Sequence, residues 1–124
     1  MKISIIQEKS FLFSSLLIGI IYELDWKLFD PLLKQLFRSW TSIWANIEEA
    51  YWWQSKKDFI AKMFIALKES KETQYRLRLL LDSKHRELQS DKRKLLLVDC
   101  IELSKIITKI IQTAKSRISI PSNL

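Results

Sequence analysis

The chain has very little of the material that tight turns, disulfides and metal sites require. It contains one glycine, Gly19, and two prolines, Pro31 and Pro121, among 124 residues. Sandwiches and barrels need many turns rich in these residues, so the composition argues against a β architecture. The single cysteine, Cys100, excludes an internal disulfide and a multi-cysteine metal site. We therefore expect a protein of the reducing cytoplasm.

Long apolar runs are also missing. The longest uncharged stretch of the N-terminal half runs from Ser10 to Tyr22. A membrane-spanning helix needs ~20 apolar residues, so we interpret this stretch as a helix with an unusually wide apolar face and expect no membrane span. The short run Ile3–Ile6 is interrupted too early for a signal peptide.

Residues for catalysis are equally scarce. His85 is the only histidine and lies in a polar segment. Without a second imidazole or more thiols, a transition-metal site is implausible, and Cys100 has no obvious base to activate it. No glycine-rich phosphate loop can exist with one glycine. We predict a protein that is not an enzyme and holds no cofactor.

The chain does contain four amphipathic helical segments. They are expected from about Ile5 to Leu24, from Pro31 to about Trp53, from Ser55 to about Asp82, and from Ser90 onward. Asp30-Pro31 is a typical helix start, and Ser55 followed by Asp58 resembles a capping box. Short connections predict one all-α domain, an antiparallel up-down-up-down four-helix bundle over residues 1–124. The end from Arg117 to Leu124 is predicted to be poorly ordered.

Charge is unevenly distributed along the chain. Residues 1–54 hold five basic and six acidic side chains, whereas the remaining residues hold sixteen and eight, within a net charge of +7. A basic C-terminal half could contact phosphate, although a solvated lysine-rich helix surface is the simpler interpretation. The nucleic-acid candidates are cations around the third connection and along the last helix. They are Lys84, Arg86, Lys92, Arg93, Lys94, Lys105, Lys109, Lys115 and Arg117.

Two stretches, SIWANIEEA and QSKKDFIAKMFIALKESKETQYRLRLL, carry a family resemblance. With KSFLF, KQLFRS and IITKIIQTAK, they make nearly the whole chain similar to the four-helix-bundle proteins first recognised in 23S rRNA intervening sequences. The resemblance implies a homo-oligomeric ring, commonly a pentamer, with no established enzymatic activity. A distant relative, the accessory protein of diversity-generating retroelements, contacts nucleic acid. Binding of structured RNA is therefore a second expectation from the resemblance.

The departures from the family pattern are clustered and go from small or polar to large and apolar. The family usually has glycine at Trp40 and Trp44, a small polar residue at Phe64, and charge near Leu16. The predicted interface residues are Leu16, Trp26, Phe29, Trp40, Trp44, Tyr51, Trp52, Trp53 and Phe64.

Trp40, Trp44, Ile47 and Tyr51 recur at spacings of four, three and four, which predicts one stripe along a helix. The stripe could fill the core. A core that accepted glycine at two positions would be overpacked by indoles, however, so we favour an interface. We interpret the chain as a surface-redesigned family member, whose aromatic surface contacts either a second copy or a designed partner chain.

Overall fold

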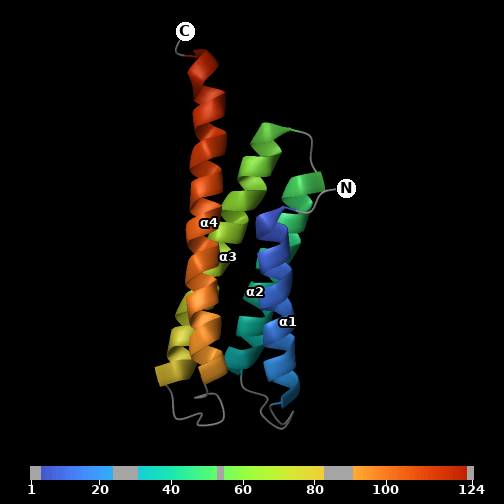
Figure 1. Ribbon diagram of the computed structural model, residues 1–124, viewed down its shortest axis with the longest axis vertical. Helices are drawn as coiled ribbons and strands as arrows, with labels where there is room; N and C mark the ends of the chain where they lie inside the picture. Colours follow the sequence, from blue (N-terminus) through green and yellow to red (C-terminus); the bar gives the residue numbers. More distant parts are fainter. Residues whose placement is uncertain (1–3, 24–30, 53–54, 83–90, 123–124) are drawn as a thin grey trace.

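The computed structural model describes residues 4–23, 31–52, 55–82 and 91–122, which form four α-helices. They are α1 (Ile5–Glu23), α2 (Pro31–Trp52), α3 (Lys56–Asp82) and α4 (Asp91–Ser122). Figure 1 shows consecutive helices running in opposite directions along one long axis. The predicted all-α four-helix bundle is confirmed.

Local sequence explains where two of the helices begin. Before α3, the Asp58 N–H donates to Ser55 Oγ at 3.4 Å, as the capping pattern predicts. Before α1, the Gln7 N–H donates to Ser4 Oγ at 3.2 Å, and the Ser4 N–H donates to Gln7 Oε1 at 3.0 Å. These reciprocal bonds form a complete capping box, which fixes the first turn of α1.

Helix α4 continues to Ser122 and projects beyond the other helices in Figure 1. The poorly ordered end from Arg117 stays a prediction.

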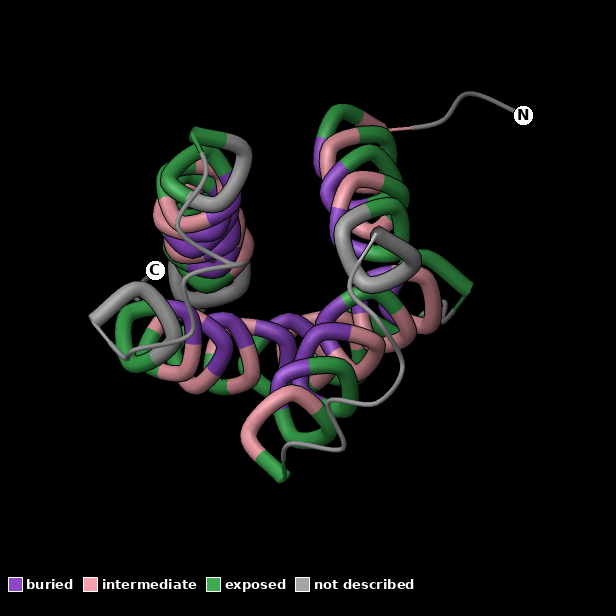
Figure 2. Tube along the Cα trace, turned by 90° about the horizontal axis from the view of Figure 1, so that it is seen from below, coloured by how far each residue is buried: buried purple, intermediate pink, exposed green. Residues whose placement is uncertain are grey.

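The core lies along the axis that the four helices share. In Figure 2, seen end-on, buried positions face the middle of the bundle and exposed positions face outward. Fully buried side chains recur at spacings of three and four along α2, α3 and α4, as the sequence periodicity predicts. The largest of them are Trp40, Ile6, Leu17, Leu36, Ile43, Ile47, Met63, Leu96 and Ile107.

Buried hydroxyl pairs join neighbouring helices. Thr73 Oγ1 donates to Ser39 Oγ at 2.9 Å between α3 and α2, and Ser70 Oγ lies 2.8 Å from Ser104 Oγ between α3 and α4. An unpaired buried hydroxyl is costly, so sliding one helix along its neighbour would be penalised at both places. The pairs therefore fix the register of α2, α3 and α4.

Within the described residues, no helix combines the length and the apolar character that crossing a membrane would require.

Candidate functional site

Helix α1 is apolar on nearly every side, but the bundle covers only part of it. Ile6, Phe13 and Leu17 point into the core. Phe11 and Leu12 are 59% and 58% exposed, and neither contacts another helix closely enough to be buried. A helix that is apolar all round is normally buried all round. The surfaces on the two flanks of α1 are therefore the first candidates for contact with another molecule.

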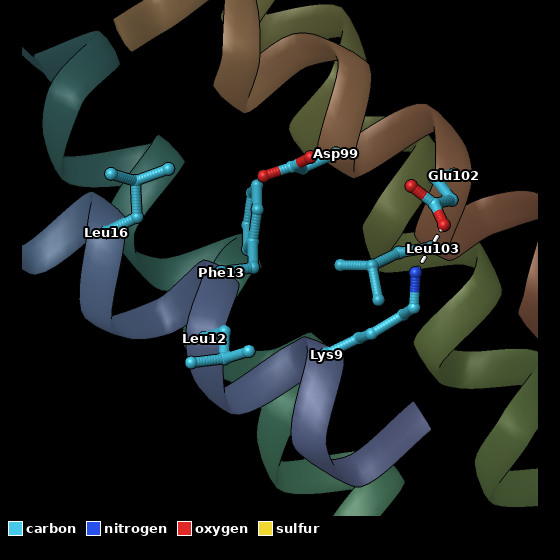
Figure 3. A pocket seen from close by; sticks show the side chains of 7 residues that line it. All are labelled: Lys9, Leu12, Phe13, Leu16, Asp99, Glu102 and Leu103. Atoms are coloured by element: carbon cyan, nitrogen blue, oxygen red, sulfur yellow. Dashed lines mark hydrogen bonds and ion pairs between the residues drawn. The ribbon is translucent and has the colours of Figure 1, made fainter. Parts of the chain in front are cut away.

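One flank of α1 forms a groove with α4, as Figure 3 shows. The groove encloses a volume of about 340 Å³. Its residues are Lys9, Leu12, Phe13 and Leu16 from α1 and Asp99, Glu102 and Leu103 from α4. We call this set the α1/α4 groove. Its apolar floor and charged rim are typical of a surface that binds a mostly apolar segment.

Charge at the rim of the α1/α4 groove is opposite on its two walls. The Lys9 ammonium donates to the Glu102 carboxylate across the groove (Figure 3). Burial raises the pKa of the Asp99 carboxyl, and the neighbouring Glu102 raises it further, although Lys9 acts in the opposite direction. Asp99 thus sits in a partly desolvated position, where an incoming donor or cation would be favourable.

The other flank of α1 meets α2 along a second apolar surface. Gln7 Nε2 donates to Glu48 Oε2 at 3.3 Å, which fixes the antiparallel register of the two helices. Phe11 follows Gln7 by four residues, and Trp44 precedes Glu48 by four, so both lie one turn further along. Two further turns bring Ile18 and Phe37, seven residues from Phe11 and Trp44, to corresponding places. We call Phe11, Ile18, Phe37 and Trp44 the α1/α2 seam.

Trp40 does not belong to a surface. The sequence predicts it in an interface, but its side chain is 2% exposed and lies in the core, so that prediction is wrong. Its indole packs against Phe13 at a centroid distance of 6.1 Å and against Phe37 at 5.7 Å. The rings meet at steep angles, the favourable arrangement for aromatic pairs. The space between α1 and α2 accommodates the indole, contrary to the overpacking expected from the sequence.

The remaining interface candidates do not form one continuous surface. Trp44 is 39% exposed on the α1/α2 seam, and the half-buried Leu16 lies in the α1/α4 groove. Tyr51 packs edge-on against Phe59 at 5.4 Å near the end of α2, where the adjacent Trp52 is 74% exposed.

Phe64 is separate from these groups, on the α4 side of α3. Trp26, Phe29 and Trp53 lie outside the described residues. The structure thus divides the predicted surface between both flanks of α1 and the N-terminal half of α3.

Four of the nine predicted nucleic-acid residues lie beyond the side chains that the structure describes, and the other five are exposed on α4. Lys84 and Arg86 lie outside the described residues, as do the side chains of Lys92 and Arg93 in the first turn of α4. Lys94 is exposed on α4. The cluster around the third connection therefore stays a prediction.

The described residues hold no group poised for nucleophilic chemistry. Burial raises the pKa of the Cys100 thiol to about 12, although the Lys71 ammonium acts to lower it. The thiol is fully buried and donates to the Ser70 carbonyl at 3.4 Å. A protonated, inaccessible thiol is a core residue. In the described part of the chain, no three potential ligands gather in a way that could hold a metal ion.

Several residues of the two α1 surfaces cannot be recognised from the sequence. The wide apolar face of the first helix is visible in the sequence, but Phe11 and Leu12 are adjacent and turn to opposite flanks. Asp99 and Glu102 are three residues apart on α4, a spacing that indicates one face. Nothing in the sequence shows that this face lies opposite Lys9, because that depends on how far α1 and α4 stand apart.

The fold and these surfaces define a class: a small antiparallel helical bundle with uncovered apolar flanks. The family model described as 23S rRNA-intervening sequence protein matches residues 4–109, so the chain belongs to that family. The resemblance found in the sequence is confirmed.

A crystal structure of a protein with unknown function from the S23 ribosomal protein family of Bacteroides thetaiotaomicron is similar to this chain. It shares 35% sequence identity, and the match covers 86% of this chain and 98% of that one with a TM-score of 0.75. No curated protein matches the sequence. Neither the family's description nor that of the crystal structure names a reaction.

Proposed function

We propose that this chain is a non-enzymatic structural subunit that assembles with copies of itself through the two flanks of α1. The observation that carries the proposal is the incomplete covering of a helix that is apolar on nearly every side. Phe11 and Leu12, one on each flank of α1, are 59% and 58% exposed. Burying a side chain of this size contributes roughly 1.5–3 kcal/mol, so association of these surfaces is favourable.

The total exposed area supports this proposal. The whole chain exposes 8678 Å². A compact monomer of 14.8 kDa would expose about 7,000 Å², so the excess is roughly 1,700 Å². A stable interface buries about 800 Å² on each partner. An excess of this size leaves room for interfaces of that area on each subunit.

The two flanks of α1 differ in composition, which favours a ring over a two-fold dimer. The α1/α4 groove is concave, with Asp99 and Glu102 at its rim, whereas the α1/α2 seam carries the aromatic rings of Phe11 and Trp44. Two different patches that bind each other form a head-to-tail contact, and such contacts close into rings. A pentamer is the ring size that the family resemblance implies. The indole of Trp44 would add aromatic area to each contact.

The test is complementation between two variants, measured by light scattering after size exclusion over a range of concentrations. Leu12→Lys places a charge in the α1/α4 groove, and Phe11→Lys places one on the α1/α2 seam. Both positions are exposed in the subunit, so both variants should fold. Each variant alone should be a monomer. Their equimolar mixture has one intact groove and one intact seam, and should give a dimer and nothing larger.

Ile65→Lys is the matched control, because Ile65 is an exposed apolar residue on α3, away from α1. It should retain the multi-subunit mass of the unaltered protein. A clean monomer for the unaltered protein would contradict the proposal and leave a different partner chain as the occupant of these surfaces. Dimers of Phe11→Lys alone would contradict the head-to-tail arrangement.

A further inference from the structure

On the side away from α1, lysines gather along the outer junction of α3 and α4. The hydroxyl pair Ser70–Ser104 fixes the register of the two helices. Lys71 and Lys105 each follow one member of this pair and are both exposed. Burial raises the pKa of Cys100, which lies on α4, and the nearby Lys71 ammonium acts to lower that pKa. Lys71 therefore lies on the side of α3 that faces α4.

Helical spacing extends this arrangement over several turns. Lys68 precedes Lys71 by three residues, and Lys109 follows Lys105 by four, so the antiparallel register brings Lys68 and Lys109 to the same level. One further turn along, the Lys115 ammonium lies 4.6 Å from the centre of the Phe64 ring, a contact between α4 and α3. We call the exposed residues Lys68, Lys71, Tyr75, Lys105, Lys109 and Lys115 the α3/α4 ridge.

The lysines of the α3/α4 ridge form no ion pair among the described residues. In the described part of the chain, the ion pairs join Lys9 to Glu102, Lys62 to Glu49, and Arg76 to Glu72. None of these pairs uses a ridge lysine. The α4 carboxylates Asp99 and Glu102 lie instead at the α1/α4 groove. Charge is thus segregated across α4, with acidic groups toward α1 and basic groups toward the ridge.

An aromatic ring stands among these cations. Tyr75 is 64% exposed and follows Lys71 by four residues, so the ring and the ammonium occupy adjacent turns of one face. Exposed aromatic rings beside rows of cations are the usual platform for single-stranded nucleic acids, because phosphates contact the cations and a base stacks on the ring. A membrane surface would instead require large apolar groups free to insert, whereas Phe64, which is 42% exposed, has the Lys115 ammonium over its ring.

We propose that the α3/α4 ridge binds a single-stranded phosphodiester chain, with phosphates on its lysines and a base stacked on Tyr75. The ridge chemistry recognises phosphate and a base face, which RNA and DNA share. The ridge does not overlap the flanks of α1, so this binding is independent of self-assembly.

The first experiment measures the anisotropy of labelled 12-nucleotide oligouridine at salt concentrations from 50 to 200 mM. The double variant Lys71→Gln, Lys105→Gln should bind at least ~10-fold more weakly at 100 mM salt. Its slope of log affinity against log salt should be smaller by about 1.4, because each lost contact with a single strand contributes ~0.7. The matched control is Lys34→Gln, Arg38→Gln, which removes the same charge from exposed positions of α2.

The control should bind within about twofold of the unaltered protein, since non-specific attraction alone depends on net charge. Equal losses in the two double variants would overturn the proposed location. Light scattering on both variants should show an unchanged mass, which separates loss of binding from loss of assembly.

Further binding measurements identify the ligand. Tyr75→Leu should weaken binding at least ~5-fold, while Tyr75→Phe should retain it, because only the ring is needed for stacking. Oligodeoxyuridine of the same length distinguishes ribose from deoxyribose as the preferred backbone. Tighter binding of a duplex than of the single strand would contradict the proposal. Binding to anionic vesicles without binding to either oligonucleotide would also contradict it.

Discussion

At the scale of single residues, two tryptophans four positions apart have opposite surroundings. Trp40 lies among Phe13 and Phe37 in the core, whereas Trp44 lies on the α1/α2 seam. The spacing correctly predicts that both lie toward one side of α2. It does not show where the boundary between the core and the surface crosses that side, because the boundary depends on how closely α1 approaches.

We expect Trp40→Ala to lower the free energy of unfolding by about 3–5 kcal/mol, because it removes a fully buried aromatic side chain and leaves a cavity. Trp44→Ala should cost about 1 kcal/mol or less in the isolated subunit, since much of the ring is already in water. Urea unfolding at low protein concentration measures both. Similar losses for the two variants would contradict the assignment of Trp40 to the core.

Gly19 offers a stabilising substitution. It lies inside α1 without a positive φ, and a Cβ built there meets nothing within 4 Å. Alanine restricts the unfolded chain more than glycine and favours the helix, so Gly19→Ala should raise the free energy of unfolding by about 0.5–1 kcal/mol. Thermal unfolding at low protein concentration tests this. A fall in stability would mean that the site is closer packed than the structure shows.

At the scale of helices, the sequence predicts the elements well because each carries its own signals. Asp30-Pro31 and Ser55 mark helix starts, and core positions repeat at spacings of three and four. The relation between helices is less accessible, because the Ser70–Ser104 and Gln7–Glu48 contacts join residues far apart in the sequence. The α1/α4 groove and the α3/α4 ridge both depend on these relations. The sequence therefore offers Lys105, Lys109 and Lys115 as candidates without showing that Lys68, Lys71 and Tyr75 lie beside them.

The capping box of α1 gives a test at this scale. Ser4→Ala removes the side-chain acceptor of the Gln7 N–H and should lower the free energy of unfolding by ~1 kcal/mol. Ser4→Asp, which keeps an acceptor and suits a helix N-terminus, should restore most of the loss. Chemical unfolding of both variants provides the measurement. An equal loss in Ser4→Asp would indicate that the hydroxyl serves a different purpose.

The stability of the protein should depend on pH through Asp99, which lines the α1/α4 groove. Its pKa is raised in the folded protein by burial and by Glu102. The protonated carboxyl therefore makes its full contribution to stability below the ordinary pKa of 3.8. This contribution is lost as pH rises through the raised pKa of the folded protein. Asp99→Asn should be more stable than the unaltered protein at pH 7, and the two should converge toward pH 3. Melting temperatures across this range test the prediction, and a variant less stable at pH 7 would contradict it.

At the scale of the whole molecule, an exposed area of 8678 Å² is large for one bundle of this size. If the flanks of α1 bind a second copy, folding and association are linked. A tenfold increase in protein concentration should then raise the melting temperature, because only folded chains associate and association stabilises the folded state.

In the Leu12→Lys variant, the melting temperature should not depend on concentration. Differential scanning calorimetry at several concentrations distinguishes the two cases. An unaltered protein whose melting temperature is constant would contradict linked assembly. A cytoplasmic location and a pentameric ring size stay predictions.

The burial of Cys100 gives the protein an internal reporter of opening. It is the only thiol in the sequence, lies fully buried between α3 and α4, and has a pKa raised by burial to about 12. A thiol-modifying reagent can react with it only when the two helices separate, so each modified molecule records one such event. The labelling rate then measures how often the bundle opens under native conditions. Comparing that rate between dilute and concentrated protein would show whether neighbouring subunits hold the bundle closed.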